Sequence, residues 1–230
     1  MASERPTADS SAPTRLAEQV HEELLGRLLS HRFEPGQRLT VDALSRELGV
    51  SQTPIREALH RLEAGGVVVR THLAGYRVGP QLTRSQFDDL VAVRLLLEPA
   101  AARAAAEHVD GERSAALARL AGALADPALQ GSDDGAGLSF AAYARQDAAF
   151  HDAVAAASGN QVLRDTLARL HVHVQLFRLG TGGRIRSEAL EEHDAVVAAV
   201  TAHDPDAAEA AMRRHVERSA ERFGATFTGG

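Results

Sequence analysis

The feature that most constrains this chain is a pair of helical patterns, at residues 41–48 and 51–64, with Gly49 between them. Apolar side chains recur at helical spacing in both patterns. Glycine adopts the backbone angles that a tight turn between two helices requires. Ser51 is a favourable N-cap for the second helix, and Pro54 falls in its first turn, where a missing N–H does no harm. The stretch therefore predicts a helix-turn-helix.

The second of these helices has one apolar face and one polar face. Its apolar side chains recur at i, i+3, i+4 and i+7, and they are Ile55, Ala58, Leu59 and Leu62. The other face carries Gln52, Thr53, Arg56, His60 and Arg61. Gly65-Gly66 ends the helix, and β-patterns follow at residues 67–69 and 76–78, with a turn through Gly75. We therefore expect a two-stranded wing after the helix-turn-helix.

The polar face of the second helix suits the major groove of DNA, where Arg reads guanine and Gln or Thr reads other bases or phosphates. The expected DNA-binding residues are Arg38, Ser51, Gln52, Thr53, Arg56, Arg61 and Gly75. Residues 1–80 contain 10 Arg and 10 acidic residues, so DNA binding must depend on where individual Arg side chains point and on dimerisation. A winged helix that contacts only other proteins is the alternative.

The same region resembles a known family. Its pattern is Leu39-x4-Leu44-Ser45-x2-Leu48-Gly49-Val50-Ser51-x-Thr53-Pro54-Ile55-Arg56-Glu57-Ala58-Leu59-x-Arg61-Leu62-Glu63. This pattern is similar to the winged helix of the GntR family of bacterial transcription regulators. The family commonly has Arg where this chain has Gln52, so the base preference at that contact does not carry over. The resemblance implies binding to double-stranded operator DNA, and a homodimer would read a palindrome with both winged helices.

Composition excludes several other classes of protein. The chain has no Cys, so it forms neither disulfides nor thiolate metal sites. It has no signal peptide pattern and no apolar run near the roughly 18 residues that a membrane span needs, so we expect a cytoplasmic protein without membrane contact. Residues 1–13 lack periodicity and predict a disordered leader. A helix is expected from about residue 14 to 31, and Gly79-Pro80 predicts a linker at the end of the first domain.

Beyond the linker the pattern is wholly helical, which predicts an all-helical domain over residues 81–225. Helices are expected at residues 83–97, 98–109, 112–125, 138–157, 160–179, 184–202 and 205–224, with a polar loop at 126–137. The predicted fold is therefore mainly α. It consists of a winged helix-turn-helix domain with a small β-wing at residues 14–80, followed by a helical bundle.

Three of these helices place metal-ligating side chains among apolar ones. Asp147 and His151 lie one turn apart on one apolar face, while His193 and His215 lie on the apolar faces of the last two helices. One Asp and three neutral imidazoles suit a divalent transition metal ion, and they leave positions for water or an anion. Zinc is the first candidate, with nickel, manganese or iron as alternatives. For any one of these His residues, a structural role in the core is the alternative.

Two further His residues, His171 and His173, lie two positions apart in the predicted helix at 160–179. Residues at this spacing cannot share one helix face. At most one of them can point into the core, and neither is included in the predicted metal set.

The metal pattern extends the resemblance to the second domain. Asp147-x3-His151, Glu192-His193 and Met212-x2-His215 are similar to the metal-binding pattern of the FCD effector domain in the FadR-like branch of the GntR family. The resemblance covers about residues 15–222. It implies a repressor or activator whose DNA affinity is set by a small effector, usually an organic acid, which binds beside the metal in the helical domain.

Arg94 is the predicted effector contact. It shares an apolar helix stripe, and a buried guanidinium needs an anion, which a bound carboxylate could supply. An internal ion pair with Glu98 is the alternative. The expected function is a non-enzymatic regulator, with repression as the first expectation. A regulator for which the metal ion itself is the signal, and a hydrolase with a metal-bound water nucleophile, stay open.

Overall fold

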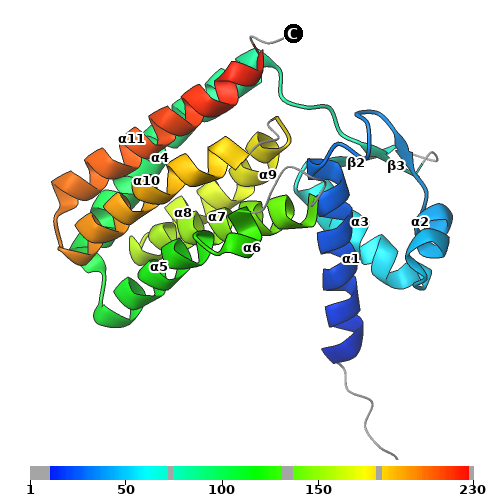
Figure 1. Cartoon of the computed structure of the whole chain (residues 1–230), viewed down its shortest axis with the longest axis horizontal. Helices are drawn as coiled ribbons and strands as arrows, with labels where there is room; N and C mark the ends of the chain where they lie inside the picture. Colours follow the sequence, from blue (N-terminus) through cyan, green and yellow to red (C-terminus); the bar gives the residue numbers. More distant parts are fainter. Residues whose placement is uncertain (1–10, 72–74, 131–136, 180–182, 228–230) are drawn as a thin grey trace, which may run out of the picture.

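The computed structural model describes residues 11–71, 75–130, 137–179 and 183–227. Its two parts are visible in Figure 1, where a small N-terminal part lies beside a bundle of helices. The elements of the N-terminal part are α1 (Ser11–Leu29), β1 (Arg38–Leu39), α2 (Val41–Leu48), α3 (Gln52–Ala64), β2 (Val68–Thr71) and β3 (Gly75–Val78). Helix α1 thus includes the end of the predicted leader, whose residues 1–10 lie outside the described part.

The helix-turn-helix forms for the reasons that its sequence suggests. Thr40 caps α2, because its Oγ1 accepts a hydrogen bond of 3.3 Å from the Ala43 N–H. Gly49 then ends α2 with a φ of 67°, a left-handed conformation that glycine adopts without steric cost. Ser51 is the N-cap residue of α3, but its side chain makes no capping hydrogen bond. The predicted helix-turn-helix is therefore confirmed.

The wing is an antiparallel sheet in which the described strands have the order β1-β3-β2. Arg38 pairs with Arg77 on one side of β3, and Val69 pairs with Arg77 on the other. The sheet and α1 to α3 enclose an aliphatic core that includes Leu24, Leu44, Ile55, Leu59, Leu62 and Val78. This core packs without any buried charge among the residues described in this part of the chain.

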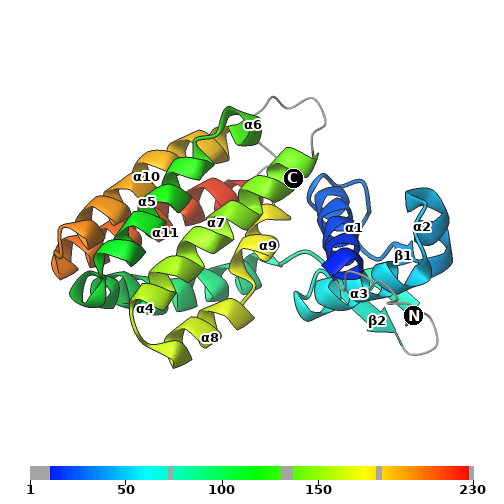
Figure 2. The same ribbon diagram turned by 90° about the horizontal axis from the view of Figure 1, so that it is seen from below.

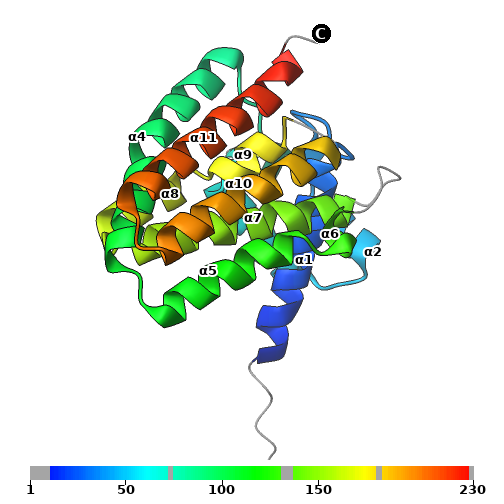
Figure 3. The ribbon, with the colours of Figure 1, turned by 60° about the vertical axis from the view of Figure 1, so that its left-hand side comes forward.

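The second part is built from helices, as predicted. These are α4 (Arg84–His108), α5 (Gly111–Leu124), α6 (Pro127–Gln130), α7 (Gly137–Ala157), α8 (Gln161–Arg169), α9 (Val172–Phe177), α10 (Gly183–Thr201) and α11 (Pro205–Gly224), followed by the short 3-10 helix η1 (Ala225–Phe227). Helix α7 contacts α4, α5, α8 and α9, while α11 packs along α4 and α10. Figure 3 shows α10 between α11 and α5.

Two helix boundaries differ from those that the sequence predicts. The predicted break at Pro99 is wrong, because α4 continues through this residue. A proline inside a helix costs about 3 kcal/mol, which the packing of α4 against α7, α10 and α11 offsets. The predicted single helix at 160–179 is also wrong, because the chain turns at His171, with a φ of 47°, and separates α8 from α9. The predicted loop at 126–137 contains α6, and its residues 131–136 lie outside the described part.

The two parts meet at two places. Helix α1 packs on α7 (Figure 2). Glu22 forms an ion pair with Arg145 at this contact. At the second place the Arg178 guanidinium, which is 3% exposed, donates hydrogen bonds of 2.6 Å to the Gly79 carbonyl and 3.1 Å to the Pro80 carbonyl. Because Arg178 directly follows α9, this short helix is attached to the segment that connects the two parts.

Candidate metal centre and nucleic-acid interface

The predicted DNA-binding residues are exposed on the winged helix. Arg38, Arg56 and Gly75 line one concave surface of about 690 Å³, together with Arg70 and Thr71 of β2. Ser51, Gln52 and Thr53 are exposed at the N-terminal end of α3. Donors at a helix N-terminus and basic side chains beside it provide the contacts that a DNA groove and its phosphates accept.

Hydrogen bonds hold the donors at the start of α3. Gln52 Nε2 donates to Asp42 Oδ1 at 2.6 Å, and Arg56 Nη2 donates to Gln52 Oε1 at 3.3 Å. Arg61 is placed differently, because its guanidinium forms an ion pair of 2.6 Å with Glu57. It also faces His21 of α1, whose pKa is lowered mainly by burial and further by the positive charge of Arg61. Arg61 is not among the residues that line the concave surface.

The four predicted metal ligands come together in the helical part. Asp147 and His151 come from α7, His193 from α10 and His215 from α11, and all four are buried. His193 Nε2 lies 3.2 Å from Asp147 Oδ1, and the Nε2 atoms of His151 and His215 lie 3.2 Å apart. Helix α7 and the consecutive helices α10 and α11 therefore place four ligating groups at one point in the core.

Carboxylates on the outside of the cluster set the orientation of two imidazoles. His151 Nδ1 lies 2.8 Å from Glu98 Oε2, and His215 Nδ1 lies 2.9 Å from Glu192 Oε2. Arg222 holds Glu192 with two hydrogen bonds of 2.7 and 2.8 Å. A neutral imidazole has one N–H, and where Nδ1 donates it, Nε2 keeps a lone pair. Carboxylate, imidazole and ion in this order are the usual arrangement around a protein-bound metal.

The donor set therefore fits a cation. The Nε2 atoms of His151 and His215 face each other at 3.2 Å, and where both rings carry their proton on Nδ1, a positive ion between the two Nε2 lone pairs would remove their repulsion. The Nδ1 atom of His193 is buried and has no hydrogen-bond partner among the described residues, which is costly for a polar atom in the core. Both observations suit a divalent transition metal ion bound by imidazole and carboxylate.

The protonation states also suit a metal. Burial lowers the pKa of His215 to about 3, and burial likewise lowers the pKa of His151. Burial raises the pKa of Asp147, but hydrogen bonds from His173 and His193 hold that pKa well below its usual range. Near neutral pH the cluster thus presents two neutral imidazoles and a carboxylate anion, which are the forms that bind metal ions.

Sequence reasoning missed His173, Glu98, Glu192 and Arg222 as parts of this cluster. His173 was excluded because its expected helix was continuous, whereas the turn at His171 starts a new helix. Its Nδ1 lies 2.7 Å from Asp147 Oδ2. The adjacent pair Glu192-His193 was part of the family pattern, but nothing in the sequence indicated which imidazole its carboxylate would meet.

Arg94 has the internal partner that the sequence left as the alternative. It is buried in α4, and its Nε and Nη2 atoms lie 2.6 and 3.3 Å from the two carboxylate oxygens of Glu98. Its Nη1 atom faces Ser219 Oγ at 3.5 Å. Burial raises the pKa of Glu98, but Arg94 and then His151 hold this pKa well below its usual range. One carboxylate therefore joins Arg94 to the imidazole cluster.

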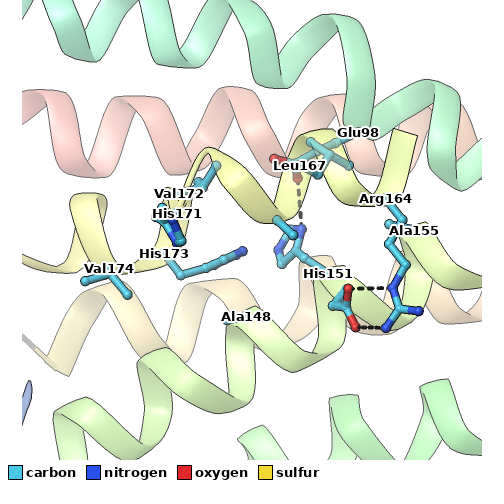
Figure 4. Close-up of a pocket in the computed structure, with 12 residues that line it drawn as sticks. Glu98, Ala148, His151, Ala155, Arg164, Leu167, His171, Val172, His173 and Val174 are labelled. Carbon is cyan, nitrogen blue, oxygen red and sulfur yellow. Dashed lines mark hydrogen bonds and ion pairs between the residues drawn. The ribbon is translucent and has the colours of Figure 1, made fainter. Parts of the chain in front are cut away.

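Two cavities adjoin the cluster from different sides. The larger, of about 250 Å³, lies among α7, α8 and α9, and its lining includes Glu98, His151, His171 and His173 (Figure 4). The smaller, of about 10 Å³, is lined by Arg94, Asp147, His215 and Ser219, among others. The smaller has room for about one water molecule, whereas the larger can hold a small organic molecule.

An N-terminal winged helix-turn-helix joined to a helical domain defines a DNA-binding transcription regulator. The chain matches the family described as bacterial regulatory proteins, gntR family, over residues 16–78, and the FCD domain over residues 89–218. The chain belongs to the GntR family and carries an FCD domain. The predicted fold class and family are confirmed, and the relatives are transcription regulators and not enzymes.

Several relatives match most of the chain. The probable D-xylose utilization operon transcriptional repressor of Paenarthrobacter nicotinovorans is 28% identical over 204 residues, covering 88% of this chain and 86% of its own length. The HTH-type transcriptional repressor NanR of Escherichia coli (strain K12 / DH10B) is 26% identical over 231 residues, covering 89% and 83%. Among solved structures, E. coli McbR/YncC has a TM-score of 0.67 at 22% identity and covers 92% of this chain and 98% of its own. The last similarity concerns the fold.

A membrane location has no support from the described helices, since none of them is both long and apolar enough to span a bilayer.

Proposed function

We propose that this protein is a homodimeric repressor whose affinity for a palindromic operator is set by a small organic acid bound beside a divalent metal ion. The DNA-binding part is supported by the family match and by the exposed donors at the start of α3. The metal part is carried by the facing Nε2 atoms of His151 and His215. Repression is supported by the two relatives that are named as repressors.

Asp147, His151, His193 and His215 would hold the ion. A bound ion would supply a positive charge within this buried cluster and open coordination positions for an anion. Glu98 would then serve two groups, because it orients His151 and neutralises Arg94. This arrangement keeps the imidazoles in place before the ion binds.

An organic carboxylate would fill an open position on the ion and contact Arg94 through Nη1, the guanidinium nitrogen that does not bind Glu98. Arg94 lines the smaller cavity of about 10 Å³, whereas the cavity of about 250 Å³ adjoins the cluster beside His151, so a molecule that contacts Arg94 and occupies the larger cavity would extend across the cluster. Because the volume of the larger cavity is near the lower end of ligand pockets, which start at about 300 Å³, the effector should be a small acid.

The effector signal must reach the winged helix across the two contacts between the parts. Helix α7 carries Asp147 and His151 and packs on α1, and the Arg178 side chain after α9 binds the carbonyls of Gly79 and Pro80. A ligand that prefers one arrangement of these helices would change the spacing of the two DNA-reading heads in a dimer. It can do so only by its difference in affinity for the two arrangements.

The metal and effector proposal is tested by elemental analysis of protein purified without chelator, followed by calorimetric titration of small organic acids. Metal-loaded protein should bind the effector much more tightly than metal-stripped protein. His193→Ala should lose most of the effector affinity and keep the operator affinity of the ligand-free protein. His108→Ala, which removes an exposed imidazole from α4, is the matched control. Equal effector affinity with and without metal would contradict a shared site.

The DNA-binding proposal is tested by selecting operators from a random pool of duplexes. Titration then measures the affinity, and light scattering measures the mass of the complex and hence the number of bound chains. A palindrome bound by two chains is the expected result, because two linked half-sites gain affinity from each other. A monomer at micromolar concentration that binds DNA specifically would contradict the proposed dimer.

A second candidate function is a regulator for which the metal ion alone is the signal. It is favoured by the Arg94–Glu98 pair, because Glu98 already supplies an anion to this guanidinium. Operator affinity that changes with metal, in the absence of any organic acid and with no further change when acids are added, would favour this candidate.

A further inference from the structure

A fourth imidazole, that of His173, lies at the edge of the buried cluster. Its side chain is 14% exposed, and its Nδ1 atom lies 2.7 Å from Asp147 Oδ2. Its ring centroid lies 4.7 Å from that of His151. Asp147 therefore lies between two imidazoles, with His193 at Oδ1 and His173 at Oδ2. In Figure 4 the His173 side chain extends from its helix toward His151.

The backbone turn before α9 brings His173 to this position. In one continuous helix, His171 and His173 would point in directions about 200° apart, at 100° per residue. His171 instead has a φ of 47°, and a left-handed backbone at a residue other than glycine costs on the order of 1–2 kcal/mol. Strain of this kind persists where the surrounding structure requires it, often at binding sites. The turn lets both His171 and His173 line the cavity of about 250 Å³.

The distances are those of a ligand set. One atom from each of Asp147, His151 and His173 can be chosen so that all three lie within 4.8 Å of one another. With metal bonds of about 2.0–2.2 Å, two ligands of one ion lie about 3 Å apart at right angles and up to about 4.4 Å apart when opposite, so the 4.8 Å limit is close to the width of one coordination sphere. His151, His193 and His215 satisfy the same 4.8 Å limit. The two groups share His151.

We propose that His173 is a protein ligand of the metal ion, in addition to Asp147, His151, His193 and His215. Five protein ligands suit an ion with octahedral coordination, such as Ni²⁺, better than tetrahedral Zn²⁺, and they leave one position open. That position would face the cavity that His173 lines. This inference rests on the metal binding proposed above and adds a ligand that the family pattern in the sequence does not contain.

A ligand on α9 also ties the ion to the connection between the two parts of the molecule. His173 lies in the first turn of α9, and Arg178, directly after the last turn, binds the carbonyls of Gly79 and Pro80. Binding of the ion to His173 would therefore fix α9, and with it one of the two contacts with the winged helix. Without the ion, only the hydrogen bond to Asp147 would hold the His173 side chain at the cluster.

The test uses the full-length dimer, loaded with Ni²⁺ after removal of bound metal. His173→Ala should lower Ni²⁺ affinity by at least about 10- to 100-fold, the range for loss of a group that only supports a ligand. X-ray absorption at the nickel edge should count one imidazole fewer than in the unchanged protein. Hydrogen exchange should show that Ni²⁺ protects α9 in the unchanged protein and no longer does so in His173→Ala, while protection of α7 and α10 remains.

His171→Asn is the matched control, because His171 lines the same cavity and asparagine tolerates the left-handed backbone of the turn that directly precedes α9. It should keep both the affinity and the imidazole number of the unchanged protein. An unchanged imidazole number in His173→Ala, even with weaker binding, would overturn the assignment and leave His173 as a hydrogen-bond partner of Asp147. If the unchanged protein binds no metal at all, the proposed function fails together with this inference, whereas binding that is equal in both proteins refutes this inference alone.

Discussion

The two parts of this molecule place their polar side chains in opposite ways. In the winged helix, the described core is aliphatic, and the Arg side chains are on the surface, where Arg38, Arg56 and Arg70 surround one concave face. In the helical part, Asp147 and three His residues are buried together with the Arg94–Glu98 pair. The first part therefore presents its polar groups at the surface, and the second encloses them in its core.

Because of this difference, mutations of polar residues in the winged helix should affect binding alone, whereas mutations in the buried cluster should affect both binding and stability. Removal of an exposed Arg from the winged helix should change DNA affinity and leave the free energy of unfolding almost unchanged. Removal of one buried group from the cluster leaves its partners without hydrogen bonds or with unpaired charge, which costs stability as well as binding. The following predictions test this difference, from the largest expected effect to the smallest.

The largest effect is expected from Leu59→Ala in the winged-helix core. Leu59 is 0% exposed, and truncation of a buried Leu typically costs about 2–5 kcal/mol of unfolding free energy. Urea unfolding should show this loss, while metal affinity stays the same. Leu96→Ala is the matched control, because Leu96 is 74% exposed and its loss should cost less than about 0.5 kcal/mol. If Leu59→Ala also lowered metal affinity, the folding of the winged helix and metal binding in the helical part would be coupled.

The next effect concerns pH and the metal-stripped protein. Burial lowers the pKa of His215 from 6.5 to about 3. Between these two pH values the imidazole is protonated in the unfolded chain but stays neutral in the folded protein. Stability must then fall as the pH decreases from about 6.5 toward 3, by up to about 1.4 kcal/mol per pH unit, or about 2–3 kcal/mol by pH 4.5. The pKa of Glu192 is raised by burial but lowered to about 2 by its hydrogen bonds, so this group adds to the loss below pH 4.5.

Urea unfolding at a series of pH values measures this loss. His215→Gln should flatten the dependence between pH 6.5 and 4.5, because the titrating group is removed. The same steep dependence in this variant would show that other groups cause the acid sensitivity.

Arg56→Ala should weaken operator binding by about 1–3 kcal/mol and leave unfolding unchanged, because Arg56 lies on the exposed concave surface at the start of α3. A gel-shift titration measures the affinity. Arg61→Ala is the comparison on the same helix, and its effect should be smaller, since Arg61 pairs with Glu57 and does not line that surface. A larger effect of Arg61→Ala would indicate that the helix meets DNA with a different face.

The smallest effect is expected from Thr53→Ala, at about 0.5–1 kcal/mol for one hydrogen bond to a phosphate. Because phosphate contacts carry no sequence information, the loss should be equal for operator and non-operator DNA. A loss confined to the operator would instead make Thr53 a base contact.

Much of the fold followed from the sequence because its signals are local. Gly49 and Ser51 mark the turn and the second helix of the helix-turn-helix whatever the rest of the chain does. Asn160 and Asp204 likewise precede α8 and α11 as N-cap residues, close to the helix starts that the sequence predicts at residues 160 and 205. Helical spacing also shows which residues share a face, so it identified Asp147 with His151 as one pair.

The tertiary structure decided what depends on contacts between distant segments. Packing on both sides of Pro99 keeps α4 continuous against the local preference of proline, and the left-handed turn at His171 brings His173 to Asp147. Arg94 pairs with Glu98, and Glu98 also meets His151 of another helix. Periodicity reports the faces of a helix but not which faces meet, because that choice is made by the free energy of packing the whole core.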